Sequence, residues 1–563
     1  MTKETESLQS NRRKFVKSGV LGMAGLGLVQ NQGVRGSTTN RISLFNVLDY
    51  GAIGDGKTMN TAAFARAIAA CADAGGGIVF VPPGVFITGP IYLQSNMSFH
   101  TSGGAIVKGS SKLEDYPVED DGSWGQGSGE STRAGVLTGR DLKNIAVEGL
   151  GIIDGAAMAY HDPNTMHGRV NKQYTRQGED YMHPRYGTQH GPIAHPERPG
   201  NVVRFFNCQN VQVRDVTIQN SPTWTVQFNR CENVNVTGVN INSHDSGRRV
   251  PNDDGMDIFK CRNVHISDCD IQTGDDCIAI FGGEALTVTN CTLSSRSSGI
   301  RVGYIGGDIR NCTYQNLVIN SNRGISLFVR GADSIENISF SNIIIRSQLV
   351  TGHWWGQAEP IHVSAIHWDP NADTLGTITN VRFTNIVAES DSGIVVHGSE
   401  NSLIKDLLFE NIRLTMKDSS LQPSYGGNFD LRAAKDASQA LFAHDIPAMY
   451  CRFVDGLRIK ALQVLWDKKL PDFFNYALQF EDLKNVSIEE FEGRQPHEKG
   501  STIDLKRVDD IAIKNSRAAE GTDIFLHHEE VTNAKLFANN DATAAETAIK
   551  PDNADFTMVG NLL

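Results

Sequence analysis

The segment Asn252-Asp253-Asp254-Gly255-Met256-Asp257 is followed, after one apolar strand pattern, by Thr273-Gly274-Asp275-Asp276. Asp254 and Asp276 lie 22 residues apart, and so do Asp253 and Asp275. A period in the low twenties, with one short strand pattern per period, is typical of stacked coils. Residues one period apart then lie above one another, at about the 4.8 Å spacing between strands. We therefore expect these aspartates to cluster on one lateral face of a solenoid.

The same strand pattern recurs along most of the chain. Copies begin at Lys143, Gln209, Glu232, Arg262, Ser334, Ile378 and Lys484. Each copy has alternating apolar residues, so one set of side chains points into the coil. The interval from Val234 to Val264 is 30 residues, which implies an inserted loop around His244 to Pro251. The pattern predicts an all-β fold, with a single solenoid domain over residues 40–563.

A helix is expected at the start of this solenoid. Asn60 or Thr61 is a good helix N-cap, and apolar residues recur at helical spacing up to Ala74, where Gly75-Gly76-Gly77 ends the pattern. The open end of a solenoid needs a cover, and this helix is the candidate cap. Inside the coils, we expect cysteines at equivalent repeat positions to form a buried ladder that needs no disulfide. Those cysteines are Cys208, Cys231, Cys269 and Cys291.

Charge and the amino terminus restrict the partners. The net charge of −12 argues against nucleic acid, whose backbone needs lysine and arginine, but a local basic pocket is enough for an acidic polysaccharide. Arg12 and Arg13 precede an apolar, glycine-rich run from Val20 to Val29, which is typical of a twin-arginine export signal. The run is too short for a membrane span. We assign residues 1–36 to the signal, with no clear cleavage site, and expect a periplasmic or secreted protein.

Two long loops carry polar and aromatic residues suited to binding. Residues 156–200 are rich in histidine, but the spacing matches no metal-ligand pattern, so we expect a polar cleft wall. Residues 350–370 contain Trp354, Trp355 and Trp368, which are either a sugar-stacking platform or packing against the coil. Glu359 and His362 beside them are candidates for substrate contact or for a hydrogen-bonded loop.

Several motifs together resemble glycoside hydrolase family 28, the polygalacturonase and rhamnogalacturonan hydrolase family. They are Asp49-Tyr50-Gly51-Ala52, Asn220-Ser221-Pro222-Thr223-Trp224, the Asn252 to Asp257 segment and Gly274-Asp275-Asp276-Cys277. The resemblance implies a right-handed parallel β-helix and an inverting hydrolase that needs no cofactor and no metal. It implies that Asp276 is the general acid, and that Asp254 and Asp275 position and activate water. Close carboxylates raise each other's pKa, and an inverting pair leaves about 6.5–9.5 Å for water.

The chain departs from the family pattern at two places. Ser298 stands where a Gly-His-Gly motif has histidine, and Ser326 and Phe328 stand where an Arg-Ile-Lys motif has its basic residues. An arginine on these coils is expected to replace the missing cations, because arginine clamps a carboxylate with two hydrogen bonds. The candidate substrate-binding residues are therefore Asn252, Asp257, Arg301, Arg323, Arg330, Trp354, Trp355, Glu359 and His362.

Two alternatives remain open from the sequence. The aspartates are also suitable Ca²⁺ ligands, as in a polysaccharide lyase that cleaves by β-elimination. The fold is also suitable for a carbohydrate-binding protein without catalysis. In all three readings the partner is a polysaccharide or oligosaccharide, in the first an acidic pectic or algal one.

Overall fold

The computed structural model describes residues 43–119, 132–162, 175–178, 193–194, 197–242, 252–304, 306–350, 354–435, 440–551 and 556–563. The expected export signal, most of the loop at 156–200 and the inserted loop at 244–251 lie outside these residues. Ser43–Leu563 form one compact unit, and we describe that unit alone.

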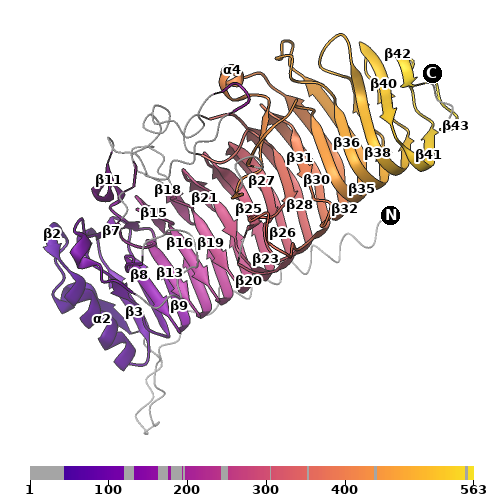
Figure 1. Ribbon diagram of the computed structural model, residues 1–563. Helices are drawn as coiled ribbons and strands as arrows, with labels where there is room; N and C mark the ends of the chain where they lie inside the picture. Colours follow the sequence, from indigo (N-terminus) through magenta and orange to yellow (C-terminus); the bar gives the residue numbers. More distant parts are fainter. Residues whose placement is uncertain are drawn as a thin grey trace, which may run out of the picture. The chain divides into compact units, whose positions relative to one another are not determined.

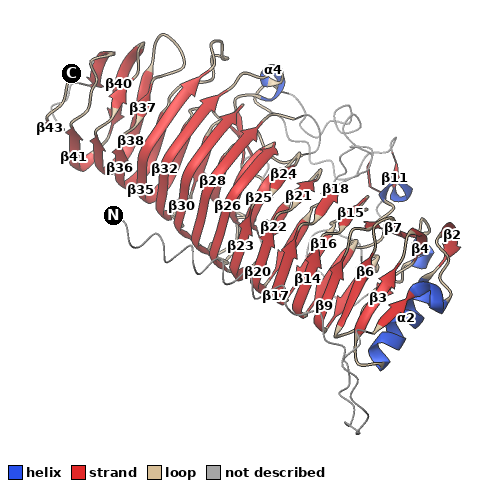
Figure 2. Cartoon of the chain, turned by 180° about the vertical axis from the view of Figure 1, so that it is seen from behind, coloured by secondary structure: helices blue, strands red, loops and turns tan. Residues whose placement is uncertain are grey.

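The unit is a parallel β-helix in which each coil contributes strands to three columns (Figures 1 and 2). Column 1 comprises β5 (Ile91–Tyr92), β8 (Leu137–Arg140), β13 (Val203–Phe206), β16 (Val226–Asn229), β19 (Met256–Phe259), β22 (Ile278–Ile280), β25 (Ser298–Tyr304), β27 (Arg323–Val329), β29 (Ile361–Ala365) and β31 (Ile394–His397). Column 2 comprises β1 (Leu44–Asn46), β3 (Gly77–Val81), β6 (Met97–Thr101), β9 (Lys143–Glu148), β14 (Gln209–Arg214), β17 (Glu232–Thr237), β20 (Cys261–Ser267), β23 (Gly283–Thr289), β26 (Ile309–Ser321), β28 (Ile335–Ser347), β30 (Ile378–Ser390) and β32 (Ile404–Met416). Column 3 comprises β2 (Asp55–Met59), β4 (Gly84–Thr88), β7 (Ala105–Gly109), β10 (Ile152–Asp154), β15 (Thr217–Gln219), β18 (Asn240–Asn242), β21 (Asp270–Gln272) and β24 (Thr292–Ser294).

The sheet continues to the last described coils. Its remaining strands are β35 (Met449–Trp466), β36 (Leu478–Glu489), β37 (Glu492–Gly493), β38 (Ser501–Lys514), β39 (Arg517–Ala518), β40 (Thr522–Glu529), β41 (Thr532–Ala538), β42 (Ala545–Lys550) and β43 (Thr557–Val559). Two short antiparallel pairs lie outside this sheet, β11 (His161–Asp162) with β12 (Ile193–Ala194), and β33 (Asn428–Asp430) with β34 (Leu441–Ala443). The parallel β-helix expected from the repeats is therefore confirmed.

Stacked side chains of like kind fill the coils. Tyr314, Phe340, Phe383 and Phe409 form a continuous aromatic stack with ring centroids 4.7, 5.1 and 4.9 Å apart. Such pairs add stabilisation to that of apolar burial. All nine cysteines are free and buried, and Cys231 N–H donates to Cys261 Sγ at 3.3 Å. The buried cysteine ladder predicted from the repeat positions is confirmed.

A ladder of asparagines sets the backbone turn in four consecutive strands of column 2, β9, β14, β17 and β20. In each of these strands the asparagine comes just before the apolar residues. Asn144, Asn210, Asn233 and Asn263 have φ between 55° and 57°, a conformation that asparagine tolerates better than most residues. Their side chains are hydrogen-bonded from coil to coil, with distances of 2.8, 3.1 and 2.7 Å. One residue type therefore provides both the backbone turn and a polar contact between coils.

A helix covers the first coil, as the sequence predicts. The helix α2 (Thr61–Asp73) directs Phe64 against Phe86 and Phe99, with ring centroids 6.2 and 5.9 Å apart. The remaining helical turns are η1 (Val47–Tyr50), η2 (Leu113–Asp115), η3 (Ala157–Tyr160) and α4 (Gln422–Tyr425). Within the described part of the chain, no helix has the length and apolar character needed to cross a membrane.

Candidate active site

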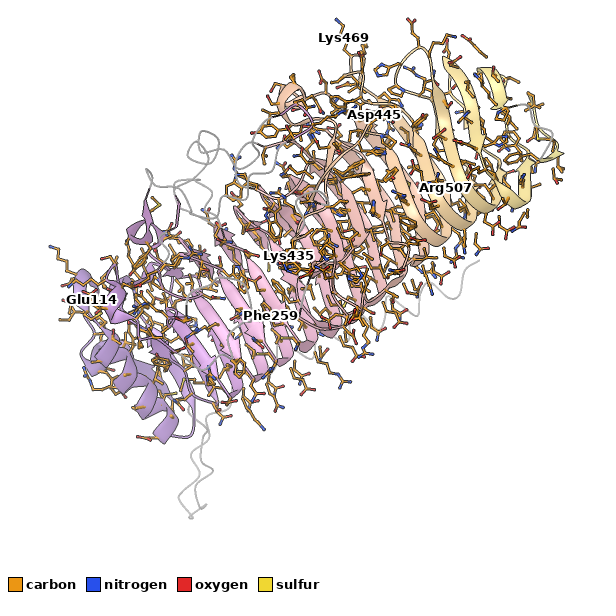
Figure 3. All side chains as sticks on the ribbon, viewed as in Figure 1. Glu114, Phe259, Lys435, Asp445, Lys469 and Arg507 are labelled. Atoms are coloured by element: carbon orange, nitrogen blue, oxygen red, sulfur yellow. The ribbon has the colours of Figure 1, made fainter. Side chains whose placement is uncertain are left out.

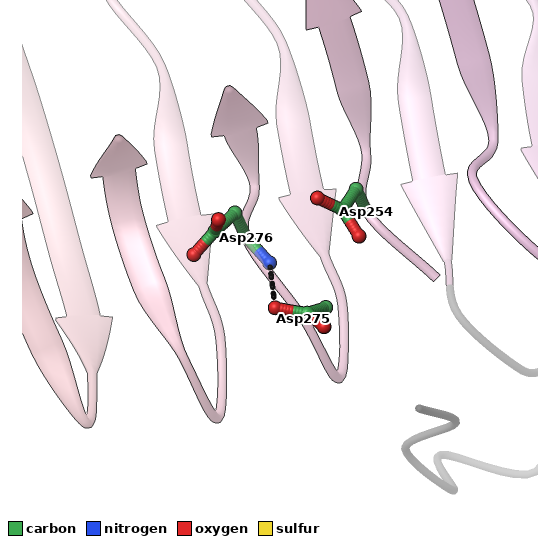
Figure 4. Close-up of side chains that lie close together, drawn as sticks. All are labelled: Asp254, Asp275 and Asp276. Atoms are coloured by element: carbon green, nitrogen blue, oxygen red, sulfur yellow. Dashed lines mark hydrogen bonds between the residues drawn. The ribbon is translucent and has the colours of Figure 1, made fainter. Parts of the chain in front are cut away.

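Three aspartates meet on one lateral face, at the turns that lead into column 1. Asp254 precedes β19, while Asp275 and Asp276 precede β22 on the next coil. One carboxylate oxygen from each residue lies within 4.8 Å of those of the other two. Figure 4 shows the three carboxylates on adjacent turns, with Asp276 N–H donating to Asp275 Oδ1 at 3.1 Å. The predicted cluster is present, and this spacing is tighter than the about 6.5–9.5 Å expected between an inverting pair.

Asp253 braces the turn that carries the other coil's acids. Its Oδ1 accepts hydrogen bonds from the backbone N–H groups of Gly274 and Asp275, at 2.8 and 3.0 Å. Asp253 is fully buried. The side chain is therefore used within the protein, and it fixes Asp275 relative to Asp254. The sequence motif contains Asp253, but its role as a brace requires knowledge of the turn geometry.

Arg301 is the cation of the cluster. It points outward from β25, the next coil, and its Nε donates to Asp276 Oδ2. Its Nη2 lies 3.8 Å from Asp254 Oδ2, and the other Asp276 oxygen accepts from Ser298 N–H at 3.0 Å. Both oxygens of Asp276 therefore accept hydrogen bonds from the next coil. Burial lowers the pKa of Arg301, but Asp276 and Asp254 outweigh that effect and raise it overall.

The other two aspartates are shifted toward the protonated form. Burial raises the pKa of Asp275 to about 7, with a further contribution from the charge of Asp276 and opposition from Arg301 and a hydrogen bond with Ser297. Burial and the neighbouring acids also raise the pKa of Asp254 well above its usual range. Asp275 is the only one of the three that is partly exposed to solvent. The cluster therefore places an accessible carboxyl with a raised pKa beside a carboxyl that Arg301 binds.

Aromatic rings line the column next to the acids. Phe259 and Phe281 are stacked with centroids 4.0 Å apart, and each lies 5.6 Å from Trp224. Figure 3 labels Phe259 on this part of the ribbon. The Arg301 guanidinium carbon lies 4.2 Å from the Phe281 ring centroid, a favourable cation–π contact. Sequence reasoning assigned no role to Phe259 or Phe281. Phe259 is two residues after Asp257, and Phe281 is two residues after Ala279. Because alternate residues of a strand share a face, this spacing indicates that both rings lie on the outward face.

The predicted substrate-binding residues fall into two groups. Asn252, Asp257 and Trp355 lie beside the acids: Asn252 is partly exposed in the same turn, Asp257 contributes to the raised pKa of Asp254, and Trp355 N–H donates to Ser297 Oγ at 3.3 Å. Trp355 and Trp368 also flank the half-buried Tyr304 ring, at 6.3 and 5.8 Å.

The second group lies on the next coils, away from the acids. Arg323, Arg330, Trp354, Glu359 and His362 are all at most 3% exposed. Most of their polar contacts are with other protein groups: Arg330 donates to the Ala433 and Leu431 carbonyls, and His362 Nε2 lies 2.8 Å from Ser364 Oγ. The structure does not bring these five residues into the catalytic cluster. Their partner Asp430 was missed because its segment follows no repeat.

Comparison with known proteins identifies the family. The sequence pattern of the family described as Glycosyl hydrolases family 28 matches residues 79–425. The chain belongs to glycosyl hydrolase family 28. It is therefore a glycoside hydrolase, and the suspected resemblance is confirmed.

The sequence identity between this chain and its relatives is low, so the chain is a divergent member of family 28. A probable polygalacturonase of Vitis vinifera is 25% identical over 375 residues, which cover 62% of this chain and 69% of the relative. An exo-poly-alpha-D-galacturonosidase of Dickeya chrysanthemi is 30% identical over 268 residues, covering 44% and 43%. The solved structure of a hyperthermoactive exopolygalacturonase from Thermotoga maritima has 26% identity and a TM-score of 0.53, covering 66% of this chain and 87% of that one.

The donor set of this family 28 site is poorly suited to a Ca²⁺ ion. The three aspartates alone are a conceivable set of metal ligands, since Ca²⁺ takes carboxylate oxygens. However, Asp276 already binds the Arg301 guanidinium, which also faces Asp254. A guanidinium this close repels a divalent cation. The arginine provides the positive charge that a metal would otherwise bring.

Proposed function

We propose that the protein hydrolyses O-glycosidic bonds in pectic polysaccharide, with inversion at the anomeric carbon. Support for the substrate class comes from the relatives named polygalacturonase and exopolygalacturonase. The observation that carries the chemistry is the unequal state of the two adjacent acids. Asp275 is partly exposed with a pKa raised to about 7, whereas Asp276 is buried and bound by Arg301.

In this proposal Asp275, rather than Asp276, is the general acid. A general acid must carry a proton near the working pH and must reach the leaving oxygen. Asp275 meets both conditions. Asp276 accepts hydrogen bonds from Arg301 and Ser298 on its two oxygens, so both oxygens are already engaged within the protein. The contacts therefore favour exchanging the roles that the family resemblance implied for these two residues.

The water nucleophile is assigned to Asp254 and Asp276. Within the described chain, Asp254 Oδ1 is buried and has no hydrogen-bond partner, so it is free to orient a water. Asp276, which is paired with Arg301, accepts the proton of this water. One oxygen of Asp254 and one of Asp276 lie at most 4.8 Å apart. A single water that makes two hydrogen bonds of about 2.8 Å can bridge that distance. The close spacing thus accommodates an attacking water between these two carboxylates.

Arg301 has a defined part in this scheme. Its charge pairs with Asp276 and compensates the clustered acids. Asn252 and Trp355, both partly exposed, are the proposed sugar contacts beside the acids, whereas Asp257 is 0% exposed and does not reach the substrate. We also propose that residues 1–36 direct twin-arginine export, which would bring the enzyme to the periplasm or the medium, where pectic polymers are found.

Proton NMR of fresh products tests the proposal. Wild type and Asp275→Asn are incubated with homogalacturonan, rhamnogalacturonan and a panel of algal polysaccharides. New reducing ends that first appear in the inverted anomeric form, and are strongly reduced in the variant, are the expected result. Products of retained configuration would overturn the inverting mechanism. A 4,5-unsaturated product would identify a lyase, and absence of any new reducing end across the panel would overturn the hydrolase proposal.

A further inference from the structure

The outward face of column 1 is buried on the catalytic coils and on the coils that follow them. In column 2, β28 and β30 alternate between buried and exposed residues, as expected for a solenoid with one face in solvent. In column 1, every residue of β27 and β29 is buried. Ser326 and His362 point outward at paired positions on these strands, yet both are 0% exposed. Another part of the chain must therefore lie on this face.

The cover consists of residues 354–360 and 428–433, which we name the plug. Arg330, directly after β27, donates to the carbonyls of Leu431 and Ala433, at 2.9 and 2.6 Å. Arg323 Nη2 donates to the Asp430 carbonyl at 2.6 Å. The backbone carbonyls of the plug thus bind two arginines, Arg323 at the start of β27 and Arg330 directly after its end.

The two plug segments are also attached to each other. Gly356 N–H donates to Asp430 Oδ2 at 2.6 Å, and Asp430 N–H donates to Glu359 Oε1 at 2.6 Å. Arg432 binds the Asp430 carboxylate and the Trp354 carbonyl. With Arg323, these residues form a buried charge network in which Asp430 and Glu359 are 0% exposed. Breaking one pair leaves an uncompensated buried charge, so the network resists opening.

A segment from the amino-terminal side contacts the outer part of this cover. Thr175 Oγ1 donates to the Ser424 carbonyl at 2.9 Å, and Arg176 N–H donates to Asn428 Oδ1 at 2.8 Å. Arg176 also pairs with Asp445, which Figure 3 labels. Residues 424–428, which lead into the second plug segment, are therefore bound by Thr175 and Arg176. The plug segment that follows them is bound by Arg323 and Arg330.

We infer that the substrate cleft ends at the plug, so that the enzyme cleaves at a chain end and not within the polymer. Arg301 and Ser326 are paired neighbours on β25 and β27, so the plug's contacts with the β27 coil lie one coil, about 4.8 Å, beyond the catalytic arginine. A polymer that crossed the acids in both directions would have to occupy that covered face. Only a terminal sugar fits between the acids and the plug. This inference rests on the proposed function.

The product pattern of the wild-type enzyme is the first test. The substrate is a homogalacturonan oligosaccharide of defined length with a fluorescent label at its reducing end. Stepwise loss of terminal units is expected, either as a labelled ladder shortened at the other end or as release of the label on a short fragment. Early labelled products from the middle of the chain would overturn the inference while leaving the hydrolase proposal intact.

Hydrogen exchange provides a second test that does not require turnover. In the wild-type protein, the amides of Gly356 and Asp430 are expected to exchange as slowly as those inside β27. Exchange as fast as in an exposed loop would show that the plug opens and would overturn the inference, even if no substrate in the panel were cleaved. Slow exchange with no turnover would leave the closed cleft supported and the proposed function refuted.

Asp430→Asn tests the plug directly. The change keeps the side-chain shape but removes the charge that pairs with Arg323 and Arg432. Faster exchange of residues 354–360 and the appearance of mid-chain products are expected. Asp482→Asn is the matched control, because Asp482 also pairs with two arginines, Arg452 and Arg507, several coils away (Figure 3). Equal product patterns for both variants, with faster exchange in Asp430→Asn, would overturn the link between plug and chain-end cleavage.

Discussion

Replacement of Asp275 by asparagine is expected to have opposite effects on catalysis and on the stability of the folded protein. Asparagine preserves the shape and the carbonyl acceptor that binds Asp276 N–H, but it has no proton to donate to a leaving oxygen. General acid catalysis contributes about 10²–10⁴-fold to rate. We therefore expect kcat for the polysaccharide to fall by that factor, with little change in KM. An aryl glycoside of the same sugar, whose leaving group needs no proton, should lose much less.

The same replacement is expected to stabilise the folded protein. Because folding raises the pKa of Asp275 from 3.8 to about 7, the wild type loses stability as pH rises between those two values, and the full loss persists above pH 7. Three pKa units correspond to at most about 4 kcal/mol, and the partial exposure of Asp275 reduces the expected effect to about 2 kcal/mol. The variant should equal the wild type below about pH 4 and exceed it at pH 8.

Two assays distinguish these effects. Urea unfolding at pH 4 and pH 8 gives the difference in free energy of unfolding, and kcat/KM against pH gives the ionisation of the acid. For the wild type, kcat/KM should decline about tenfold per pH unit above about pH 7, as the acid loses its proton. A variant with full activity on the polysaccharide would refute the assignment of Asp275 as the acid. A variant less stable than wild type at pH 8 would refute the electrostatic reasoning.

Further predictions follow from the contacts around the cluster and in the coils. Arg301→Gln should reduce kcat at least tenfold and shift the alkaline limb of the pH profile upward, because Arg301 lowers the pKa of Asp275, the proposed acid; a decline confined to KM would contradict this. Asp253→Ala should cost about 2 kcal/mol in urea unfolding and reduce kcat, whereas Asp253→Asn, which retains an acceptor, should cost less. Asn233→Ala should lower the free energy of unfolding by about 1–2 kcal/mol, and Asn233→Gly by less, because glycine tolerates its positive φ; equal losses would refute the backbone argument. EDTA should leave the initial rate unchanged, and a chelator-sensitive rate would favour the lyase chemistry.

The sequence predicts the parts of this molecule that repeat. The period of 22 residues between Asp254 and Asp276 is sufficient to place them on neighbouring coils, because strand spacing is nearly constant in any β-helix. It also predicts the capping helix and the buried cysteines. Arg301 was recognised as a candidate, but its partner was not, since a substrate carboxylate and Asp276 are chemically equivalent from sequence alone.

Residues outside the repeat could not be placed in this way. Arg323 and Glu359 were predicted to contact substrate, yet they bind each other and Asp430, which is 107 residues from Arg323 in the chain. No periodicity relates residues 428–433 to column 1, so the plug has no sequence signal. The roles of Asp275 and Asp276 were likewise not separable, because local hydrogen bonds determine which of two adjacent carboxyls retains a proton.

The free thiols have a consequence for where the chain can fold. None of the nine cysteines is paired, and all are buried among apolar side chains. Burial raises the pKa of several of these thiols, as it does for Cys451, and makes them less reactive toward oxidants, whereas a hydrogen bond with Cys269 lowers the pKa of Cys291. The coils therefore need no oxidising compartment to reach their native state, and reducing agents should leave the melting temperature unchanged. The protein can complete its fold among the reduced thiols of the cytoplasm and remain unaltered in an oxidising exterior.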